Sequence, residues 1–392
     1  VVAGESRAQK FEELALTPPM GWNSWNHFGC DVTEALIRET ADAMVESGMK
    51  AAGYEYVNID DCWHGARDSL GFIQADPERF PSGMKALADY VHSRGLKLGI
   101  YSDAGWRTCA GRPGSRGYEY QDALTYARWG IDYLKYDWCS TGNLEAEGAY
   151  QTMSAAIRAA GRPMVLSVCE WGQNDPWEWA APYGHLWRTT GDITSCWDCV
   201  INHGTWSSWG ILPILDMQEG LRQFSGPGHW NDPDMMEVGN GMSVSEDRAH
   251  FTMWAMLAAP LIAGNDLRSM SEATRETLTN RGVIAVDQDP LGIQGFPFRT
   301  TGDVQIWFRP LAGGAWAVAV LNRGEGAAEV HFDWQAEPVN DGLSGRSTEF
   351  HEVTYRLHDL WADRAMGDTR TPLVATVLSH DVLMLRLDPV DG

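Results

Sequence analysis

Short apolar segments alternate with amphipathic stretches over the first three quarters of the chain. Eight such segments, each ending beside a polar or acidic residue, cover 20–25, 54–61, 97–103, 133–139, 164–171, 185–192, 229–236 and 260–266. Between them, stretches such as 33–47, 83–94 and 143–160 carry apolar residues at helical spacing. Eight strand–helix units predict a (β/α)8 barrel. A doubly wound open sheet is the competing arrangement, but no glycine-rich phosphate turn follows the first strand.

The pattern changes between residues 292 and 296. The segments 303–308, 315–321, 328–332, 353–357 and 381–387 are short, rich in β-forming residues and separated by glycine-containing breaks. Few helical patterns lie between them, which predicts a C-terminal antiparallel β-sandwich. We therefore divide the chain into a polar, loosely held lead (1–15), a (β/α)8 barrel domain (16–294) and the sandwich (295–392).

Composition narrows the class of protein. The 392 residues are 44% hydrophobic and 21% charged, which is typical of a folded globular chain. The net charge of −23 argues against a nucleic-acid partner, because a phosphate backbone requires a basic surface. No apolar run approaches the ~20 residues of a membrane span, so no membrane partner is expected. The chain begins at Val1 rather than Met, from which we expect a removed leader and a secreted or otherwise exported protein.

Residues 133–139 have the sequence YLKYDWC, which predicts a short buried strand. Side chains two positions apart share a face of a strand, so the Lys135 ammonium lies beside the Asp137 carboxylate and favours its ionised form. An ionised carboxylate at a strand end, partly desolvated by Tyr136 and Trp138, suits a nucleophile or an electrostatic stabiliser. A structural ion pair is the alternative interpretation.

Acidic residues recur where the predicted barrel strands end, and in a barrel these ends meet at one face. The acids are Asp60, Asp61, Asp103, Asp137, Glu170 and Asp192. Because only Lys135 and Arg188 offset them, we expect a neutral, hydroxyl-rich ligand whose OH groups donate hydrogen bonds to carboxylates. Nineteen tryptophans agree with this interpretation, since flat rings stack on the apolar face of a sugar, although most of them are expected to fill the core.

Two of these acids suit glycoside hydrolysis, which uses one carboxylate as nucleophile and one carboxylic acid as proton donor. Asp137 beside Lys135 is the better ionised candidate. Asp192 lies four residues after Arg188 in a stretch without an adjacent lysine, which makes it the candidate acid. The sequence has neither clustered strand-end histidines nor the paired C-x-x-C…C-x-x-C or H-E-x-x-H patterns of zinc sites, so no metal or cofactor is expected.

The ordered motifs of the chain resemble those of glycoside hydrolase family 27, the α-galactosidases and α-N-acetylgalactosaminidases. The motifs are LTPPMGWNSW (16–25), DDCW (60–63), GIYSD (99–103), KYD (135–137), CEW (169–171), WRTTGD (187–192) and WNDPDM (230–235). The resemblance runs to VDQDPLG at 286–292 and continues more weakly into the sandwich. Each motif alone is modest, but the ordered set is specific.

The resemblance implies a retaining exo-acting α-galactosidase that removes terminal α-linked D-galactose from oligosaccharides, galactomannans or glycoconjugates. By the family pattern, Asp137 is the nucleophile and Asp192 is the acid and then the base, with carboxyl groups about 5 to 5.5 Å apart. In the family, Asp60 and Asp61 hold the galactose hydroxyls at C4 and C6. The positions that surround the sugar in the family are Trp25, Asp60, Asp61, Tyr101, Lys135, Glu170 and Arg188.

Related activities remain alternatives: an α-N-acetylgalactosaminidase, a β-L-arabinopyranosidase or an isomaltodextran-cleaving enzyme. Glu170 resembles the galactose-specific version of its loop, in which small residues do not make room for an acetamide at C2. The intact Asp60–Asp61 pair favours galactose over a sugar that lacks C6. A galactose-binding protein without catalysis is an alternative from another class, but both Asp137 and Asp192 are present. The oligomeric state is left open.

Seven cysteines leave at least one thiol unpaired if the others form disulfides within the chain. The resemblance implies the disulfides Cys30–Cys62 and Cys109–Cys139. It also indicates that Cys169 is the free thiol, because the partner found in some relatives is replaced here by a glycine. The remaining two cysteines, Cys196 and Cys199, form either a tight local disulfide or two free thiols.

Other polar residues near the predicted rim are expected to have no catalytic role. Similar enzymes use Asp232 and Asp234 within the seventh barrel strand, so we expect a structural or supporting role for both. Structural, packing or solvated roles are expected for Asp266, Asp289, His203 and His229.

Overall fold

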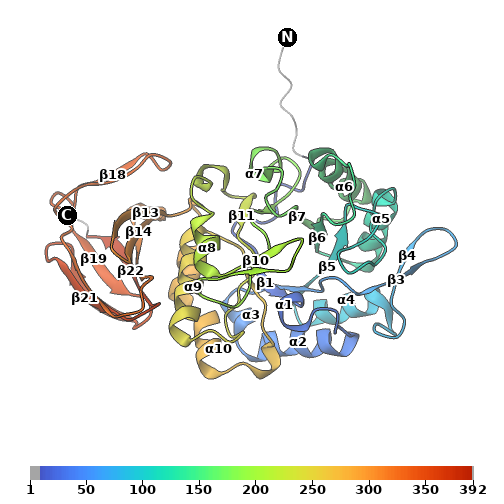
Figure 1. Ribbon diagram of the computed structural model, residues 1–392, viewed down its shortest axis with the longest axis horizontal. Coiled ribbons are helices and arrows are strands. Elements are labelled where there is room, and N and C mark those ends of the chain that lie inside the picture. The colour runs from blue at the N-terminus through green and yellow to red at the C-terminus, as the bar shows by residue number, and fades with distance from the viewer. Residues whose placement is uncertain (1–8, 391–392) are drawn as a thin grey trace, which may run out of the picture.

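The computed structural model describes residues 9–390, and a closed barrel of parallel strands forms its larger part (Figure 1). The barrel strands are β1 (Met20–Asn23), β2 (Tyr56–Asn58), β5 (Lys97–Asp103), β6 (Tyr133–Asp137), β7 (Val165–Cys169), β8 (Leu186–Arg188), β11 (Trp230–Asp232) and β12 (Leu261–Ala263). Around the sheet their order is β11-β8-β7-β6-β5-β2-β1-β12. A parallel bridge between Met236 and Ala263 joins the two ends of this sheet. Each strand lies within one predicted segment, so the barrel prediction is confirmed and the open sheet is excluded.

Helices surround this sheet and join its strands. They are α1 (Trp25–Phe28), α2 (Glu34–Glu46), α3 (Met49–Ala52), α4 (Gly83–Ser93), α5 (Glu119–Trp129), α6 (Ala146–Ala160), α7 (Pro176–Trp179), α8 (Ile211–Asp216), α9 (Val244–Leu257), α10 (Glu272–Leu278) and α11 (Arg281–Asp287). Local chemistry sets some boundaries: the Thr33 hydroxyl accepts from Leu36 N at the start of α2, and Ser243 and Glu246 form a capping box on α9. Within residues 9–390, no helix combines the length and the apolar character needed to cross a membrane.

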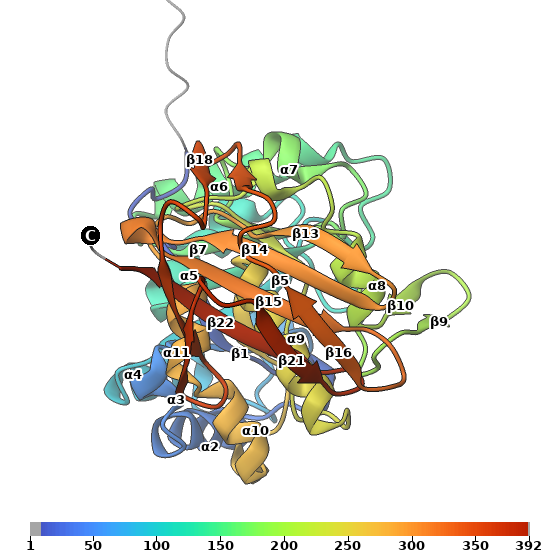
Figure 2. The ribbon, with the colours of Figure 1, turned by 90° about the vertical axis from the view of Figure 1, so that its left-hand side faces the viewer.

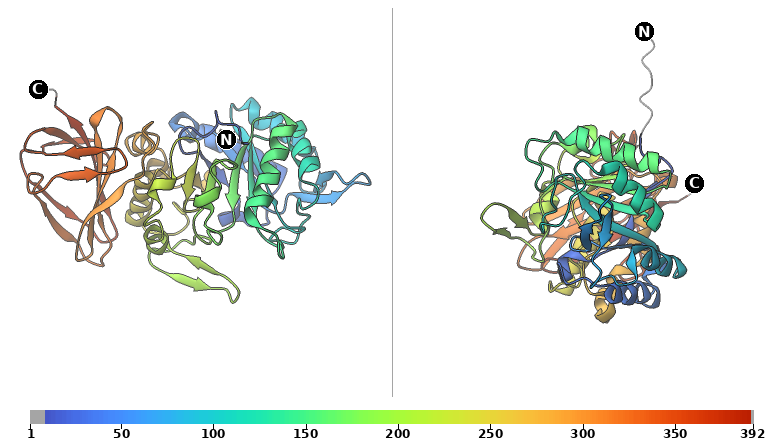
Figure 3. Two further views of the ribbon diagram at one scale, coloured as in Figure 1. Left: turned by 90° about the horizontal axis from the view of Figure 1, so that it is seen from above. Right: turned by 90° about the vertical axis from the view of Figure 1, so that its right-hand side faces the viewer.

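Two hairpins extend from the loops that follow barrel strands, and neither was predicted. One pairs β3 (His64–Arg67) with β4 (Ile73–Ala75) after β2, and the other pairs β9 (Val200–Asn202) with β10 (Ser207–Trp209) after β8. Figures 2 and 3 show the β9–β10 hairpin standing clear of the rest of the protein. These strands are too short for an alternation pattern to be recognised in the sequence.

The C-terminal part is the predicted antiparallel sandwich (Figure 2). Its larger sheet has the order β13 (Phe296–Thr301), β14 (Val304–Pro310), β15 (Trp316–Asn322), β22 (Val382–Pro389), β19 (Tyr355–Asp359) and β20 (Arg364–Asp368). Two short pairs complete it, β16 (Ala328–Phe332) with β21 (Leu373–Val377) and β17 (Val339–Asp341) with β18 (Arg346–Thr348). Side chains such as Phe308, Trp316, Phe332 and Leu385 form a core of their own. The exact boundary at residues 294 and 295 stays a prediction.

Helix α9 and strand β14 connect the barrel to the sandwich. Nearly every side chain of α9 from Ala249 to its end is buried, because the helix packs on the barrel and also against β14, β15 and β22. From β14, the fully buried Arg309 donates to the carbonyl oxygens of Ile293 (3.0 Å), Asp287 (3.2 Å) and Ala255. A buried guanidinium with several acceptors therefore holds the two parts together.

The prediction of a loosely held lead was wrong for residues 9–15; residues 1–8 lie outside the described part. Lys10 is buried, and its ammonium donates to the carbonyl oxygens of Gly184 (2.9 Å) and Gly228 (2.5 Å). The indole of Trp230 donates to Ala15 O (2.7 Å). Residues 9–15 therefore pack across the loops that precede β8 and β11, and Lys10 supplies a donor to one backbone carbonyl of each loop.

Candidate active site

A pocket opens where the barrel strands end. It is lined by Trp25, Asn26, Asp60, Asp61, Tyr101, Cys109, Lys135, Asp137, Trp171, Arg188, Asp192, Asp234 and Met235. Every residue that the resemblance assigned to catalysis or to sugar binding is among them except Glu170, and of the other predicted strand-end acids Asp103 is absent. The tertiary structure thus brings together residues from seven barrel strands or the loops directly after them, as expected for the carboxyl-terminal face of a barrel.

Asp137, at the end of β6, is held through both of its carboxylate oxygens. Tyr101 Oη donates to its Oδ2 at 2.7 Å, and Trp138 N donates to its Oδ1 at 2.9 Å. Burial raises the pKa of Asp137 to about 6, although Lys135 and the Tyr101 hydroxyl both act to lower it. The carboxylate is therefore oriented through both oxygens and ionised above about pH 6.

Lys135 does favour the ionised form of Asp137, as predicted, but its direct contact is with another acid. Lys135 Nζ lies 2.8 Å from Asp60 Oδ2, and Asn23 Nδ2 donates to the same oxygen at 2.8 Å. Burial disfavours the ammonium, but the charges of Asp60 and nearby groups still raise the pKa of Lys135 well above its usual value. The Lys135 ammonium therefore acts on Asp137 at longer range, and burial has the larger effect on the pKa of Asp137.

Asp61 is held by backbone donors rather than by a cation. Its Oδ1 accepts from Cys62 N at 2.6 Å and its Oδ2 from Ala110 N at 2.9 Å. Burial raises the pKa of Asp61 in spite of these donors. The two neighbouring acids, Asp60 and Asp61, are thus presented to the pocket in fixed orientations by different sets of donors.

Arg188, the last residue of β8, joins two acids on the far side of the pocket. Its Nη2 lies 3.1 Å from Asp192 Oδ1 and 2.9 Å from Asp234 Oδ2. The side chain of Asp192 is 42% exposed, whereas those of Arg188 and Asp234 are buried. Asp192 therefore has a cation beside it, contrary to the sequence argument, but it is the acid with the easiest access to solvent.

Glu170 is not part of the pocket surface, and the next residue takes that place. Glu170 is fully buried, and its Oε2 accepts from the backbone N (2.7 Å) and the side-chain Nδ2 (2.6 Å) of Asn174. Its Oε1 has no hydrogen-bond partner among the described residues, and burial raises its pKa to about 7. Trp171 follows with a φ of 60°, so the chain turns sharply after β7 and the indole lines the pocket.

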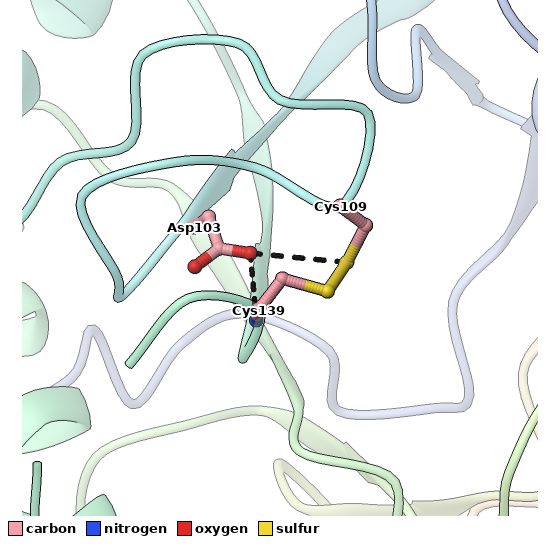
Figure 4. Close-up of side chains that lie close together, drawn as sticks. All are labelled: Asp103, Cys109 and Cys139. Carbon is pink, nitrogen blue, oxygen red and sulfur yellow. Dashed lines mark hydrogen bonds between the residues drawn. A yellow bond between two sulfur atoms is a disulfide. The ribbon is translucent and has the colours of Figure 1, made fainter. Parts of the chain in front are cut away.

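Asp103, the last residue of β5, lies beside the Cys109 and Cys139 side chains (Figure 4). Its Oδ2 accepts from Cys139 N at 2.9 Å, and its Oδ1 accepts from Gly105 N at 2.6 Å. Burial and the charge of Asp137 raise its pKa to about 9. The nearby Cys109 and Cys139 are joined in a disulfide, so their sulfurs are not available as thiolate metal ligands. Asp103 instead ties together the two loops that follow β5 and β6.

The cysteine predictions can be compared directly with the structure. The disulfides Cys30–Cys62 and Cys109–Cys139 are both present, and Cys169 is a buried free thiol, as the resemblance implied. The alternative left open for the remaining pair is decided in favour of a disulfide, Cys196–Cys199. Sequence separation alone could not decide it, because three residues of separation permit both arrangements.

Sequence reasoning missed five residues that line the pocket: Asn26, Cys109, Trp171, Asp234 and Met235. Signals for some of them were present. Asp234 follows a barrel strand within the motif WNDPDM, but it was given a structural role; it lines the pocket and also holds Arg188. Asn26 has no comparable acidic or aromatic signal, since its place depends on how α1 meets the rim.

Comparison with known proteins adds independent evidence. A family model described as "Alpha galactosidase A" matches residues 17–289, and one described as "Alpha galactosidase C-terminal beta sandwich domain" matches residues 301–387. The "Alpha-galactosidase A" of Cellvibrio japonicus (strain Ueda107) is 61% identical over 389 residues, which cover 99% of this chain and 96% of that protein. The chain belongs to the α-galactosidases of glycoside hydrolase family 27.

Solved structures of family 27 share the whole architecture. The α-galactosidase of Saccharomyces cerevisiae solved with raffinose is 31% identical with a TM-score of 0.90, covering 98% of this chain and all of that one (100%). A family 27 β-L-arabinopyranosidase from Geobacillus stearothermophilus is 26% identical with a TM-score of 0.79, covering 96% of this chain and 98% of that one. Both α-galactosidases just named are more similar to this chain in sequence than the arabinopyranosidase is.

Proposed function

We propose that this protein is a retaining exo-α-galactosidase that removes terminal α-linked D-galactose from an oligosaccharide, a polysaccharide side chain or a glycan. One observation carries the proposal: Asp137 and Asp192 face the same pocket in contrasting environments. Asp137 is buried and held through both oxygens, whereas Asp192 is the exposed acid. A firmly oriented carboxylate suits a nucleophile, and an accessible acid suits proton exchange with a leaving group and with water.

In the first step, an Asp137 oxygen attacks the anomeric carbon of galactose while the bond to the leaving oxygen breaks. Asp192 gives its proton to that oxygen, so the aglycone departs as a neutral alcohol. The product is a β-galactosyl ester on Asp137 and an Asp192 carboxylate. Arg188, at 3.1 Å from Asp192, stabilises the carboxylate that forms.

In the second step, the ionised Asp192 removes a proton from water, and the water oxygen attacks the anomeric carbon. The ester bond breaks, and its electrons return to Asp137, so galactose leaves with its original α-configuration. Tyr101 and Trp138 donate to Asp137 before and after each turnover, which stabilises the carboxylate as a leaving group.

Recognition of the sugar is assigned to Trp25, Asp60, Asp61, Lys135 and Arg188. Carboxylate oxygens accept hydrogen bonds from sugar hydroxyls, and an epimer with one misdirected hydroxyl leaves a buried acceptor unpaired. Galactose is proposed over N-acetylgalactosamine and β-L-arabinopyranose as the preferred sugar. Glu170 was first expected to contact the sugar. Its proposed role is instead to order the loop that places the Trp171 indole at the pocket.

We propose further that the protein works outside the reducing cytosol. Its three disulfides support this, because disulfides persist in oxidising compartments.

Initial rates on p-nitrophenyl α-galactoside, α-N-acetylgalactosaminide, β-L-arabinopyranoside and α-glucoside test the proposed activity. We expect the α-galactoside to dominate and Asp137→Asn to abolish its turnover, whereas Asp89→Asn on the exposed surface of α4 leaves turnover unchanged. Proton NMR of the first-formed sugar should show α-galactose. First-formed β-galactose, or full activity of Asp137→Asn, would contradict the double-displacement mechanism.

A further inference from the structure

Two tryptophans differ from all the others in this protein. Of nineteen tryptophans, all within the described part of the chain, only Trp106 (55%) and Trp206 (52%) are more than half exposed. Both lie in loops that follow barrel strands, Trp106 after β5 and Trp206 in the β9–β10 hairpin after β8. These loops belong to the face on which the pocket opens. Both exposed rings therefore lie on the face of the barrel where the catalytic residues are found.

The Trp106 ring is exposed but fixed. The Arg116 guanidinium lies over the ring at 4.4 Å from its centroid, and Arg116 Nη1 donates to Thr141 O at 2.9 Å. The far edge of the ring lies over Gly142, where an added Cβ would be 3.3 Å from Trp106 Cη2. One face of the indole is therefore covered by a cation, and its exposed surface is held in place.

The loop of Trp106 is joined to the nucleophile's strand. Cys109 of this loop lines the pocket and is disulfide-bonded to Cys139, two residues after Asp137. At Gly105 the backbone is so close that an added Cβ would lie 2.1 Å from Cys139 O. Trp106 follows directly, on the loop that contributes Cys109 to the pocket lining.

Trp206 has an equivalent connection to the proposed acid/base. Its ring stacks on His203 at 4.0 Å between centroids, at the tip of the hairpin. At the base of the hairpin, Trp209 N donates to Asp192 O at 2.9 Å. The Cys196–Cys199 disulfide braces the same loop. The hairpin therefore holds a second exposed aromatic surface in a defined position relative to Asp192.

We propose that Trp106 and Trp206 are binding platforms for sugar units of the aglycone, beyond the galactose that is cleaved. The inference rests on the proposed function and adds the substrate class: a neutral oligosaccharide or polysaccharide that carries α-galactosyl ends. A fixed indole offers apolar area to the C–H face of a sugar with little loss of side-chain freedom. The net charge of −23 disfavours an anionic polysaccharide.

The test compares kcat/KM on galactomannan oligosaccharides with kcat/KM on p-nitrophenyl α-galactoside for Trp106→Ala and Trp206→Ala. We expect the ratio of the two values to fall about three- to tenfold in each variant, since one aromatic contact is worth that much. Val374→Ala is the matched control, because Val374 is 65% exposed on the sandwich; its ratio should not change. Trp106→Phe and Trp206→Phe keep a ring and should recover part of the loss.

Affinity electrophoresis in gels containing galactomannan gives a readout without turnover. In the Asp137→Asn background, each Trp→Ala change should reduce retardation, and Val374→Ala should not. If a Trp→Ala change alters neither the ratio of the two kcat/KM values nor the retardation, that tryptophan is not a binding platform. Failure of the proposed function would appear differently, as lack of p-nitrophenyl α-galactoside turnover by the unaltered enzyme.

Discussion

Tyr101 and Asp137 lie on the neighbouring parallel strands β5 and β6, and the tyrosine hydroxyl donates to the aspartate Oδ2 at 2.7 Å. The pair places a neutral donor, rather than the expected ammonium, in direct contact with the proposed nucleophile. Burial and hydrogen bonding therefore compete at Asp137, and the balance leaves its pKa at about 6. This competition sets the pH range in which the nucleophile is ionised.

Activity on p-nitrophenyl α-galactoside should fall as the pH drops below about 6, because protonated Asp137 cannot attack. In Tyr101→Phe the ionised form loses a donor, so the pKa of Asp137 rises and the acid limb moves upward by about one pH unit. Profiles of kcat/KM between pH 4 and 9 measure the shift. Tyr120→Phe, an exposed residue of α5, should leave the limb in place; a downward shift in Tyr101→Phe would refute the assignment.

Asp192→Asn should slow the hydrolysis of substrates whose leaving group must be protonated more than that of substrates whose leaving group need not be. We expect kcat/KM to fall roughly 10² to 10⁴-fold on a galactosyl oligosaccharide and far less on p-nitrophenyl α-galactoside, whose leaving group departs without protonation. Asp198→Asn changes an exposed acid in the same loop and serves as control. Equal losses on both substrates would show that Asp192 is not the acid.

Arg309→Leu should weaken the junction between barrel and sandwich. The change removes a donor from three buried carbonyl groups, of which the one of Ala255 keeps only the Ala258 N–H (3.3 Å), and it removes the cation beside Asp287, whose pKa burial already raises to about 8. We expect the free energy of unfolding to fall by about 3 kcal/mol. Urea denaturation followed by tryptophan fluorescence measures it, with Arg370→Leu as the exposed control. A loss no larger than that of the control would show that Arg309 does not hold the junction.

The burial of Lys10 should make the free energy of unfolding rise with pH between the pKa values of Lys10 in the folded and the unfolded protein. Burial lowers the pKa of Lys10 from 10.5 to about 8 in the folded protein. Between these values the unfolded chain binds more protons, so the free energy of unfolding rises with pH and the penalty is largest below pH 8.

The measurement compares unaltered protein with Lys10→Met between pH 7.5 and 10. The difference in free energy of unfolding should change in favour of the unaltered protein by up to about 1.4 kcal/mol per pH unit above pH 8. Lys85→Met, at an exposed position of α4, should show no such slope. A flat difference for Lys10→Met would mean that the ammonium is not buried.

The alternation of apolar segments with amphipathic stretches was sufficient to predict the eight barrel strands and the helices α2, α4 and α6. Both patterns are local, because apolar side chains recur every two residues in a strand and every 3.6 residues in a helix, whatever lies elsewhere in the chain. The acids at the ends of the strands followed from the same pattern, because parallel strands of a barrel end at one face. In the sandwich, five strands were not predicted, namely β13, β17, β18, β20 and β21. In β13, Pro297 interrupts the alternation.

Contacts between distant segments were decided only by the tertiary structure. Lys135 pairs with Asp60, 75 residues away, rather than with the acid two residues along its own strand. Which of Glu170 and Trp171 faces the pocket depends on one backbone turn with positive φ, and periodicity carries no such information. The sequence by itself determined the barrel strands, the strand-end acids and, through ordered motifs, the family. The partners of each charge and the exposed Trp106 and Trp206 depended on packing, because burial and hydrogen bonding are properties of neighbours in space.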